Sequence, residues 1–299
     1  MATSRAESWW IDSATAPERH PDPPSGALPT HAAAVVIGAG LSGLGAALRL
    51  VERGVVDVIV LEQRGISGGA TGHNGGHLKA GGSADQLELE EWVVGTTAAL
   101  AQKWGIECDI RFPGSVTVAR SEDDAQRLRD QHAASDPRQR AALWTAEQCE
   151  VYTGSSEFVL GLHHPTSGQI WPAKLAVGLA QAATAAGVQL FPDVTVSGLE
   201  TAASGAVNVL LADGSSLLAE TVIVATNGWA SELLPELRTA IRPVTNQALV
   251  TAPAPRLWTK IGAVSTMPPP DDSAEYGYCL QREDGRVVLG MSRGEAWQW

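Results

Sequence analysis

The chain has 299 residues and a formal net charge of −12, with 44% hydrophobic and 18% charged residues. This length and composition predict a soluble, globular protein of one large or two ordinary domains with a buried core. The acidic balance and the lack of a basic run argue against nucleic acid or an anionic membrane as partner.

Cysteine usage and the apolar segments exclude further classes of protein. The three cysteines (Cys108, Cys149 and Cys279) are too far apart for a clustered zinc site or a disulfide framework, so we expect no metal and a cytoplasmic, reducing location. The start of the chain has prolines and acids but no apolar core, unlike a signal peptide. The apolar run 32–51 is long enough to span a membrane, but it contains Arg49 and a glycine pattern with a better explanation.

The predicted elements follow an irregular arm over residues 1–30, whose Trp9 and Trp10 we expect to dock onto the body. Apolar runs, capping boxes and glycine or proline signals predict the rest. In chain order they are strand 33–37, helix 41–53, strand 55–62, a helix from Ser83 to Trp104, strand 111–120, helices opening at 121–124 and 145–148, helix 172–186, strand 188–191, a hairpin turn at 213–214, strand 220–228, a helix near 230–240, and strands near 244–252, 276–282 and 286–291.

This order predicts an α/β protein with a Rossmann-like, doubly wound sheet and an inserted domain with a mixed or antiparallel sheet. The cofactor-binding domain would comprise residues 31–105 and 172–240. The substrate domain would comprise residues 106–171 and 241–299, so each domain uses two stretches of chain.

A dinucleotide-binding pattern stands between the first two predicted strands. Gly38, Gly40 and Gly43 form G-x-G-x-x-G after a strand and at the start of a helix, and Glu62 ends the next strand. Gly38 would make the tight turn, Gly40 would admit a pyrophosphate at the helix N-terminus, and Gly43 would allow close helix–strand packing. Glu62 would accept hydrogen bonds from a ribose diol and would repel the extra phosphate of NADP. The alternative is a plain βαβ unit with chance glycines.

The loop "GATGHNGGH" (69–77) places His73 and His77 four residues apart, a metal-ligand spacing on a helix. Its glycines make a helix unfavourable by about 1 kcal/mol each. We therefore expect a loop that brings bare backbone close to a ligand.

From about residue 32 onward, the sequence resembles the D-amino-acid oxidase-like family of FAD-dependent amine and amino-acid oxidoreductases, which includes glycine and sarcosine oxidases. The resemblance is carried by "GAGLSG", the loop 69–77, "FPDVTVSGLE", "VIVATNGWASELLP" and "EYGYCLQREDGRVVLG". It implies FAD as cofactor, with the loop 69–77 beside the flavin ring. The implied cofactor-binding residues are Gly38, Gly40, Leu41, Ser42, Gly43, Glu62, Gln63, Arg64, Ala70, Thr71, His73, Asn74, Gly75, Gly76, Val196, Thr226, Asn227 and Gly228.

The same resemblance implies a reaction and its catalytic candidates. A C–N bond of a small amine or amino acid would be oxidised by hydride transfer to the flavin, by an oxidase or a dehydrogenase. Tyr278 would line the amine pocket with Tyr276 as its neighbour, although alternation on a strand face explains both equally well. Trp171 and Trp229 are candidates for the pocket, with core packing as the favoured alternative.

Members of the family continue beyond the position that matches Trp299, so we expect a truncated chain or one completed by a partner chain. The alternative function is a catalytically silent dinucleotide-binding fragment or subunit. His73 replaces an arginine found in many relatives, and the spacing of Thr71, His73 and Gly76 resembles the covalent flavin attachment of the dimethylglycine dehydrogenase branch. A covalent bond and a simple hydrogen bond to the cofactor both stay open.

Overall fold

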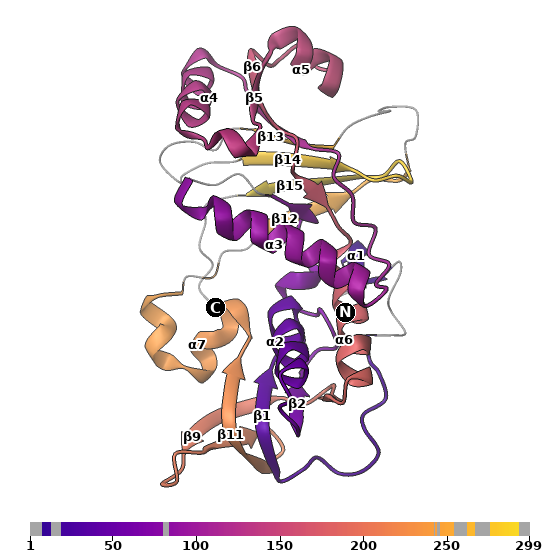
Figure 1. Cartoon of the computed structure of the whole chain (residues 1–299), viewed down its shortest axis with the longest axis vertical. Helices are drawn as coiled ribbons and strands as arrows, with labels where there is room; N and C mark the ends of the chain where they lie inside the picture. Colours follow the sequence, from indigo (N-terminus) through magenta and orange to yellow (C-terminus); the bar gives the residue numbers. More distant parts are fainter. Residues whose placement is uncertain are drawn as a thin grey trace, which may run out of the picture. The chain divides into compact units, whose positions relative to one another are not determined.

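The computed structural model describes residues 8–12, 19–79, 84–241, 243, 246–253, 262–266 and 276–292. The chain divides into two compact units, each assembled from three separate stretches (Figure 1). Unit 1 comprises residues 1–73, 101–108 and 171–243, and unit 2 comprises residues 74–100, 109–170 and 244–299.

Unit 1 contains a six-stranded sheet in the order β8-β2-β1-β11-β10-β9. The first four strands in this order are parallel, and β10 and β9 continue the sheet as antiparallel strands. Strand bounds are β1 (His31–Ile37), β2 (Val58–Leu61), β8 (Gln189–Phe191), β9 (Val196–Thr201), β10 (Val207–Leu211) and β11 (Ser216–Val224). The parallel part is the predicted Rossmann-like sheet.

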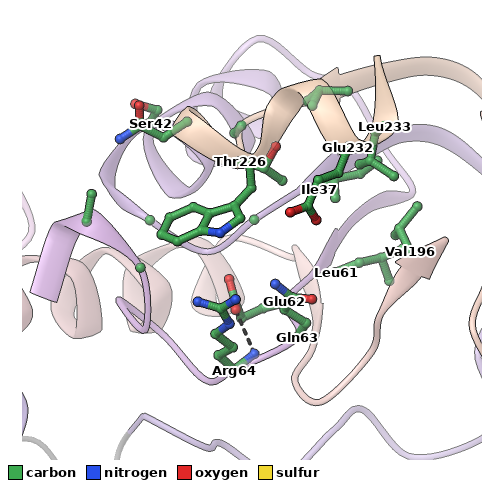
Figure 2. A pocket seen from close by; sticks show the side chains of 18 of the residues that line it. Ile37, Ser42, Leu61, Glu62, Gln63, Arg64, Val196, Thr226, Glu232 and Leu233 are labelled. Atoms are coloured by element: carbon green, nitrogen blue, oxygen red, sulfur yellow. Dashed lines mark hydrogen bonds between the residues drawn. The ribbon is translucent and has the colours of Figure 1, made fainter. Parts of the chain in front are cut away.

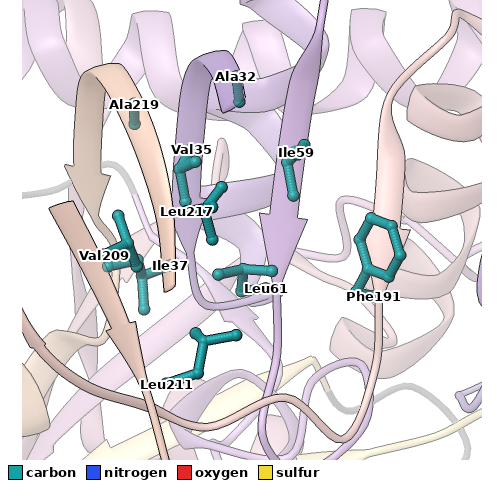
Figure 3. Close-up of a cluster of buried hydrophobic side chains, with 10 residues drawn as sticks. All are labelled: Ala32, Val35, Ile37, Ile59, Leu61, Phe191, Val209, Leu211, Leu217 and Ala219. Carbon is teal, nitrogen blue, oxygen red and sulfur yellow. The ribbon is translucent and has the colours of Figure 1, made fainter. Parts of the chain in front are cut away.

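Apolar side chains from five of these strands form the core of unit 1 (Figure 3). They are almost fully buried, as the continuous apolar sequence of parallel strands requires. The cluster consists of Ala32, Val35, Ile37, Ile59, Leu61, Phe191, Val209, Leu211, Leu217 and Ala219.

Helices α2 (Leu41–Glu52) and α6 (Pro172–Ala185) of unit 1 pack against each other. Proline at the first position of α6 and Gly187 at φ +103° after its end confirm the predicted start and stop of this helix. The arm contains a short helix, α1 (Trp9–Asp12), so it is not wholly irregular. Its docking is confirmed, because Trp10 is 2% exposed and its carbonyl accepts a 2.8 Å hydrogen bond from the Trp171 indole.

Unit 2 contains a seven-stranded sheet in the order β12-β15-β14-β13-β4-β6-β5 and a two-stranded sheet of β3 and β7. All neighbours are antiparallel except β13 and β4. Strand bounds are β3 (His77–Leu78), β4 (Ser115–Ala119), β5 (Ala142–Thr145), β6 (Leu160–His164), β7 (Gly168–Gln169), β12 (Asn246–Val250), β13 (Ala263–Thr266), β14 (Tyr276–Gln281) and β15 (Val287–Ser292). The predicted mixed sheet is thus present.

The remaining helices are α3 (Ala84–Lys103), α4 (Glu122–Ala134) and α5 (Ala146–Thr153), with α7 (Ala230–Leu233) in unit 1. Short 3₁₀ turns occupy Ala70–Gly72, Pro137–Gln139, Asn227–Trp229 and Pro235–Thr239. The capping box at Thr145 and Gln148 is complete, and the Ser121 hydroxyl accepts from the Asp124 amide. Over the described ranges, no helix combines the length and apolar character that crossing a membrane requires.

Several predicted elements are corrected. The helix near 230–240 is broken into α7 and a 3₁₀ turn, because Pro235 cannot continue an α-helix. Strand β2 starts at Val58 because Asp57 has a left-handed φ of +55°. Strands β5, β6 and β13 were not predicted, and Ser83, the predicted cap of α3, lies outside the described residues.

The expected domain division differs from the two units chiefly in one segment, and by a few residues at the other boundaries (106–108, 171 and 241–243), while the arm 1–30 groups with unit 1. Residues 74–100 were expected with the cofactor-binding domain, whereas they group with unit 2. Pairing of β3 with β7 and a 2.9 Å bond from the Ile170 amide to the Gly76 carbonyl hold this segment there. The assignment of the two units to cofactor and substrate binding stays a prediction.

Candidate cofactor-binding site

Unit 1 has a cavity of about 580 Å³ at the carboxyl ends of β1, β2 and β11 (Figure 2). This is the edge at which open parallel sheets bind ligands, and the volume is within the range of small-molecule sites. The cavity is lined by Ile37, Gly38, Gly40, Leu41, Ser42, Leu61, Glu62, Gln63, Arg64, Gly69, Ala70, Thr71, Val194, Val196, Ser197, Val224, Ala225, Thr226, Asn227, Trp229, Glu232 and Leu233.

The glycine turn between β1 and α2 leaves no room for side chains. Gly38 has φ +107°, and a Cβ atom there would lie 2.8 Å from the Ala225 carbonyl oxygen on the neighbouring strand segment. A Cβ on Gly43 would overlap the carbonyl oxygen of Gly38 itself. The turn therefore brings bare backbone and the N-terminus of α2 to the cavity, an arrangement that favours phosphate groups.

Two neighbouring contacts shape this end of α2. Gly40 is its N-cap and supplies no side-chain cap, while the Leu41 amide donates to the Thr71 hydroxyl at 3.2 Å. A Cβ on Gly40 would lie only 3.0 Å from the same hydroxyl oxygen. The short turn Ala70–Gly72 is thereby held close to the glycine turn, and both line one cavity.

Glu62 directly follows β2, and its carboxylate is fixed by two backbone groups. Oε2 accepts from the Ala39 amide at 2.8 Å. Oε1 accepts from the Arg64 amide at 2.7 Å, the bond that is dashed in Figure 2. These bonds join the glycine turn to the loop after β2. An ionised carboxylate has about four acceptor positions, so two stay available to a ligand.

Trp229 and Thr226 form the wall that follows β11. The Arg64 guanidinium lies 5.0 Å from the centroid of the Trp229 ring, and Gly69 lies against the same ring. The Thr226 hydroxyl is shielded from solvent and has no hydrogen-bond partner among the described residues. A buried hydroxyl without a partner costs about 1–3 kcal/mol, which a ligand in the cavity would recover. The glycine turn, the hydrogen-bonded carboxylate of Glu62 and the unpaired hydroxyl of Thr226 together form a site that fits a dinucleotide.

A family model described as "FAD dependent oxidoreductase" (DAO) matches residues 33–299. The chain belongs to the DAO family of FAD-dependent oxidoreductases. Membership confirms the resemblance, the mixed α/β fold class and FAD as the cofactor.

Among curated DAO-like relatives, the chain is 29% identical to "Probable oxidoreductase OrdL" of Haemophilus influenzae, covering 87% of this chain and 64% of that protein. It is 30% identical to the "tRNA 5-methylaminomethyl-2-thiouridine biosynthesis bifunctional protein MnmC" of Burkholderia multivorans, covering 92% and 41%. The chain thus spans less than two thirds of the length of either relative.

Solved structures share the DAO fold. Glycine oxidase from Geobacillus kaustophilus superposes with a TM-score of 0.73 at 20% identity, covering 88% of this chain and 72% of that one. L-proline dehydrogenase from P. horikoshii also gives 0.73 at 20% identity, covering 91% and 73%. At this identity the likeness establishes the fold alone.

Most of the DAO cofactor residues expected from the sequence line the cavity, namely Gly38, Gly40, Leu41, Ser42, Glu62, Gln63, Arg64, Ala70, Thr71, Val196, Thr226 and Asn227. Gly43 lies beneath the glycine turn, and Gly228 is not in the lining. The cavity lining also includes the strand ends Ile37, Leu61 and Val224, which were not predicted from the sequence. They could have been predicted, because open parallel sheets bind ligands at the carboxyl ends of their strands. Trp229 lines the cavity, whereas Trp171 packs on Trp9 and Trp10.

The rest of the loop 69–77 leaves this cavity. The His73 ring bonds the Gly69 carbonyl through Nδ1 at 2.8 Å and does not line the cavity. Asn74, Gly75 and Gly76 belong to unit 2, where the Asn74 side chain accepts from the Gly76 amide at 2.8 Å. No group of histidine, cysteine and acidic side chains within the described ranges is arranged to hold a metal ion.

The two candidate catalytic tyrosines are on β14 of unit 2. The Tyr278 ring is half-buried and meets the His77 ring edge to face, with centroids 4.9 Å apart. The side chain of Tyr276 lies outside the described residues. The role of both tyrosines stays a prediction.

Proposed function

We propose that the chain oxidises a C–N bond of a small amine or amino acid, with FAD as the acceptor of a hydride. The observation that carries the proposal is the cavity of unit 1, where the glycine turn, the start of α2 and the clamped Glu62 converge. The names of the structural neighbours, which include a glycine oxidase, L-amino acid deaminases and a proline dehydrogenase, support this substrate class.

The residues of the cavity would divide the binding of FAD among them. Gly38 and Gly40 would admit the pyrophosphate to the N-terminus of α2, where backbone N–H groups and the helix dipole favour negative charge. Glu62 would accept hydrogen bonds from the adenosine ribose, and Val196 would contact the adenine. Thr226 would donate its hydroxyl to the cofactor. When bound, FAD supplies the oxidising chemistry, while protein residues align the substrate and exclude water.

Tyr278 would contact the substrate as the candidate catalytic residue of unit 2. Gly75 and Gly290 leave room for its ring, because a Cβ atom on either glycine would meet it. A small amine or amino acid as the partner and a cytoplasmic location stay predictions, as does a partner chain.

The test is the visible absorption spectrum of the purified protein, followed by anaerobic addition of a panel of amines and amino acids. Bound flavin that bleaches with one of them supports the proposal. Flavin that no amine bleaches contradicts C–N oxidation while leaving FAD binding intact. Colourless protein that added FAD cannot reconstitute favours a catalytically silent subunit.

Replacing Glu62 with glutamine should weaken FAD binding by about 1–2 kcal/mol, or roughly 5- to 30-fold, because one charge-assisted acceptor is lost. The measurement is a titration of the apoprotein with FAD, followed by flavin fluorescence. Glu232→Gln is the matched control, since it removes the same charge from the same cavity. Equal affinities of Glu62→Gln and the wild type would contradict the ribose assignment.

Acid precipitation of the holoprotein should release the flavin into the supernatant. We expect this because the His73 ring is bonded to the Gly69 carbonyl and lies outside the cavity lining. Fluorescence that migrates with the polypeptide on a denaturing gel, and disappears in His73→Ala, would instead show a covalent bond to His73.

A further inference from the structure

The loop 63–72, which follows β2 and Glu62, faces the cofactor cavity with only half of its residues. Five of them belong to the lining, namely Gln63, Arg64, Gly69, Ala70 and Thr71. Residues 65–68 and Gly72 do not belong to it. The second set is therefore available for contacts with the rest of unit 1, and those contacts decide where the first set is held.

The backbone of this loop is bent in a way that needs support. Ser67 has φ +59°, a left-handed conformation that is uncommon for a residue with a side chain. Such conformations persist where the surrounding structure fixes them, and they are frequent in ligand-binding loops. The Ser67 amide donates to the Ala39 carbonyl at 3.1 Å, and the Gly72 amide donates to the Ser67 carbonyl at 3.0 Å. The bent residue thus joins the glycine turn to the end of the loop.

The N-terminal arm holds the loop directly before Ser67. The Ile66 amide donates to the Arg19 carbonyl at 2.9 Å, and Nε of Arg19 donates to the Ile66 carbonyl at 2.8 Å. Arg19 is 8% exposed and Ile66 is 1% exposed. Because the pair is buried, the loss of one partner would leave a polar group without a hydrogen bond, which costs more than the loss of a bond in water. Both backbone polar groups of Ile66 therefore depend on the arm.

Two further arm residues pack against glycines of the loop. A Cβ atom on Gly65 would lie 2.5 Å from Cε1 of His20, and one on Gly72 would lie 2.6 Å from Cδ1 of Ile11. Ile11 is 2% exposed and belongs to α1, which is itself docked on unit 1 through its tryptophans. The arm thus contacts the loop both before and after its bent residue.

We propose that the arm positions the loop 63–72 for FAD, with Ile11 and Arg19 as positioning residues that do not touch the cofactor. The inference rests on the cavity of unit 1 as the FAD site, and it does not depend on the oxidation of a C–N bond. A loop that is already held in its binding conformation loses less conformational freedom when the ligand binds, so the arm contacts contribute to the affinity. Because coupling between binding events is reciprocal, FAD should also strengthen the contact between the arm and the loop.

The first test is the affinity of the apoprotein for FAD, measured by titration with flavin fluorescence as the signal. Arg19→Met and Ile11→Ala should each bind FAD about tenfold more weakly than the wild type, the scale of one buried contact. Arg19→Gln places an amide N–H at the same position along the side chain as Nε, so it should recover most of the affinity. Ile11→Val, which loses a single methyl group, should also bind more tightly than Ile11→Ala.

Val209→Ala is the control that separates positioning from a general loss of stability. Val209 is fully buried in the core cluster of unit 1 and does not line the cavity. This variant should unfold at a lower urea concentration than the wild type and bind FAD with wild-type affinity in the absence of urea. If Arg19→Met and Ile11→Ala weaken FAD binding no more than Val209→Ala does, the arm does not position the loop.

The second test is the exchange of the Ile66 amide with deuterium, with and without FAD. This amide is bonded to the arm, and Ile66 does not line the cavity. We expect FAD to slow its exchange about tenfold, because the affinity and the arm contact change by the same factor. The amides of β10, a strand without residues in the lining, report any general stabilisation by FAD. An Ile66 amide that FAD protects no more than those of β10 would refute the coupling.

The outcomes distinguish this inference from the proposed function. Wild-type protein that binds FAD, together with arm variants that bind it equally well, overturns the positioning role and leaves the FAD site standing. Wild-type protein that binds no FAD overturns both the site and the positioning role. Flavin that no amine bleaches, together with weaker FAD binding by the arm variants, contradicts C–N oxidation and supports the positioning role.

Discussion

Gly43→Ala should destabilise unit 1 by about 3 kcal/mol and abolish the retention of FAD, because overpacking against rigid neighbours reaches this scale. The added Cβ would overlap the Gly38 carbonyl oxygen and lie 3.3 Å from the Ala225 Cβ. The overlapped atom is backbone, so it cannot move aside by a change of rotamer. Relief requires the whole glycine turn to shift away from the cavity. Urea unfolding followed by tryptophan fluorescence, together with FAD titration, measures both effects.

Gly45→Ala is the matched control in the same helix. A Cβ there would have no atom within 4 Å outside the neighbouring residues and the helix backbone. Alanine in a helix interior is favoured over glycine by about 1 kcal/mol, so this variant should be more stable than the wild type. The same substitution at positions two residues apart is thus expected to change the stability in opposite directions. Equal stabilities of the two variants would show that close packing at Gly43 is not what the glycine provides.

Lowering the pH should destabilise the protein through His77, and this is the second large effect that we expect. Its pKa is about 4 in the folded protein against 6.5 for an ordinary histidine, because the ring is buried. Between these values the unfolded chain binds a proton that the folded chain does not, so stability is present above pH 6.5 and falls as the pH decreases toward 4. The loss from this residue should reach about 3 kcal/mol.

The measurement is the free energy of unfolding in urea at a series of pH values between 7 and 4. Other groups also titrate in this range, so the informative quantity is the difference between the wild type and His77→Phe. That difference should move in favour of the variant as the pH falls. His31→Phe, at an exposed position, should follow the wild-type profile. Parallel profiles for the wild type and His77→Phe would refute the attribution to His77.

Short sequence signals correctly predicted the elements that are stabilised by residues close to one another in the sequence. The capping box at Thr145, the proline start of α6 and the apolar runs of β1 and β11 are all present. Strands β6 (Leu160–His164) and β13 (Ala263–Thr266) were missed because each is short and contains polar residues. They are strands because β4 lies between them and pairs with both, a tertiary effect that no local pattern records.

The same distinction holds for the site. The spacing of glycines followed by Glu62 predicted one wall of the cavity, since consecutive parts of a βαβ unit meet at one sheet edge. Val194 reaches the cavity because its amide donates to the Glu62 carbonyl at 2.9 Å, across more than a hundred residues of sequence. The Tyr278 ring that meets His77 likewise comes from a strand about two hundred residues further along the chain. Such groupings depend on the register of the sheets, which the sequence does not encode locally.

The strand order of unit 1 also determines how long the edges of its first strands stay unpaired during synthesis. β1 and β2 can pair early, but the second neighbour of β2 is β8 and the second neighbour of β1 is β11, which ends at Val224. At bacterial and eukaryotic elongation rates, roughly 10–30 s separate the synthesis of β2 from that of β11. Until β8 is made the apolar strand β2 presents an open edge, and until β11 is made β1 does, and such edges can pair with other chains. We therefore expect the yield on overexpression to be limited by aggregation of chains in which β11 has not yet been made.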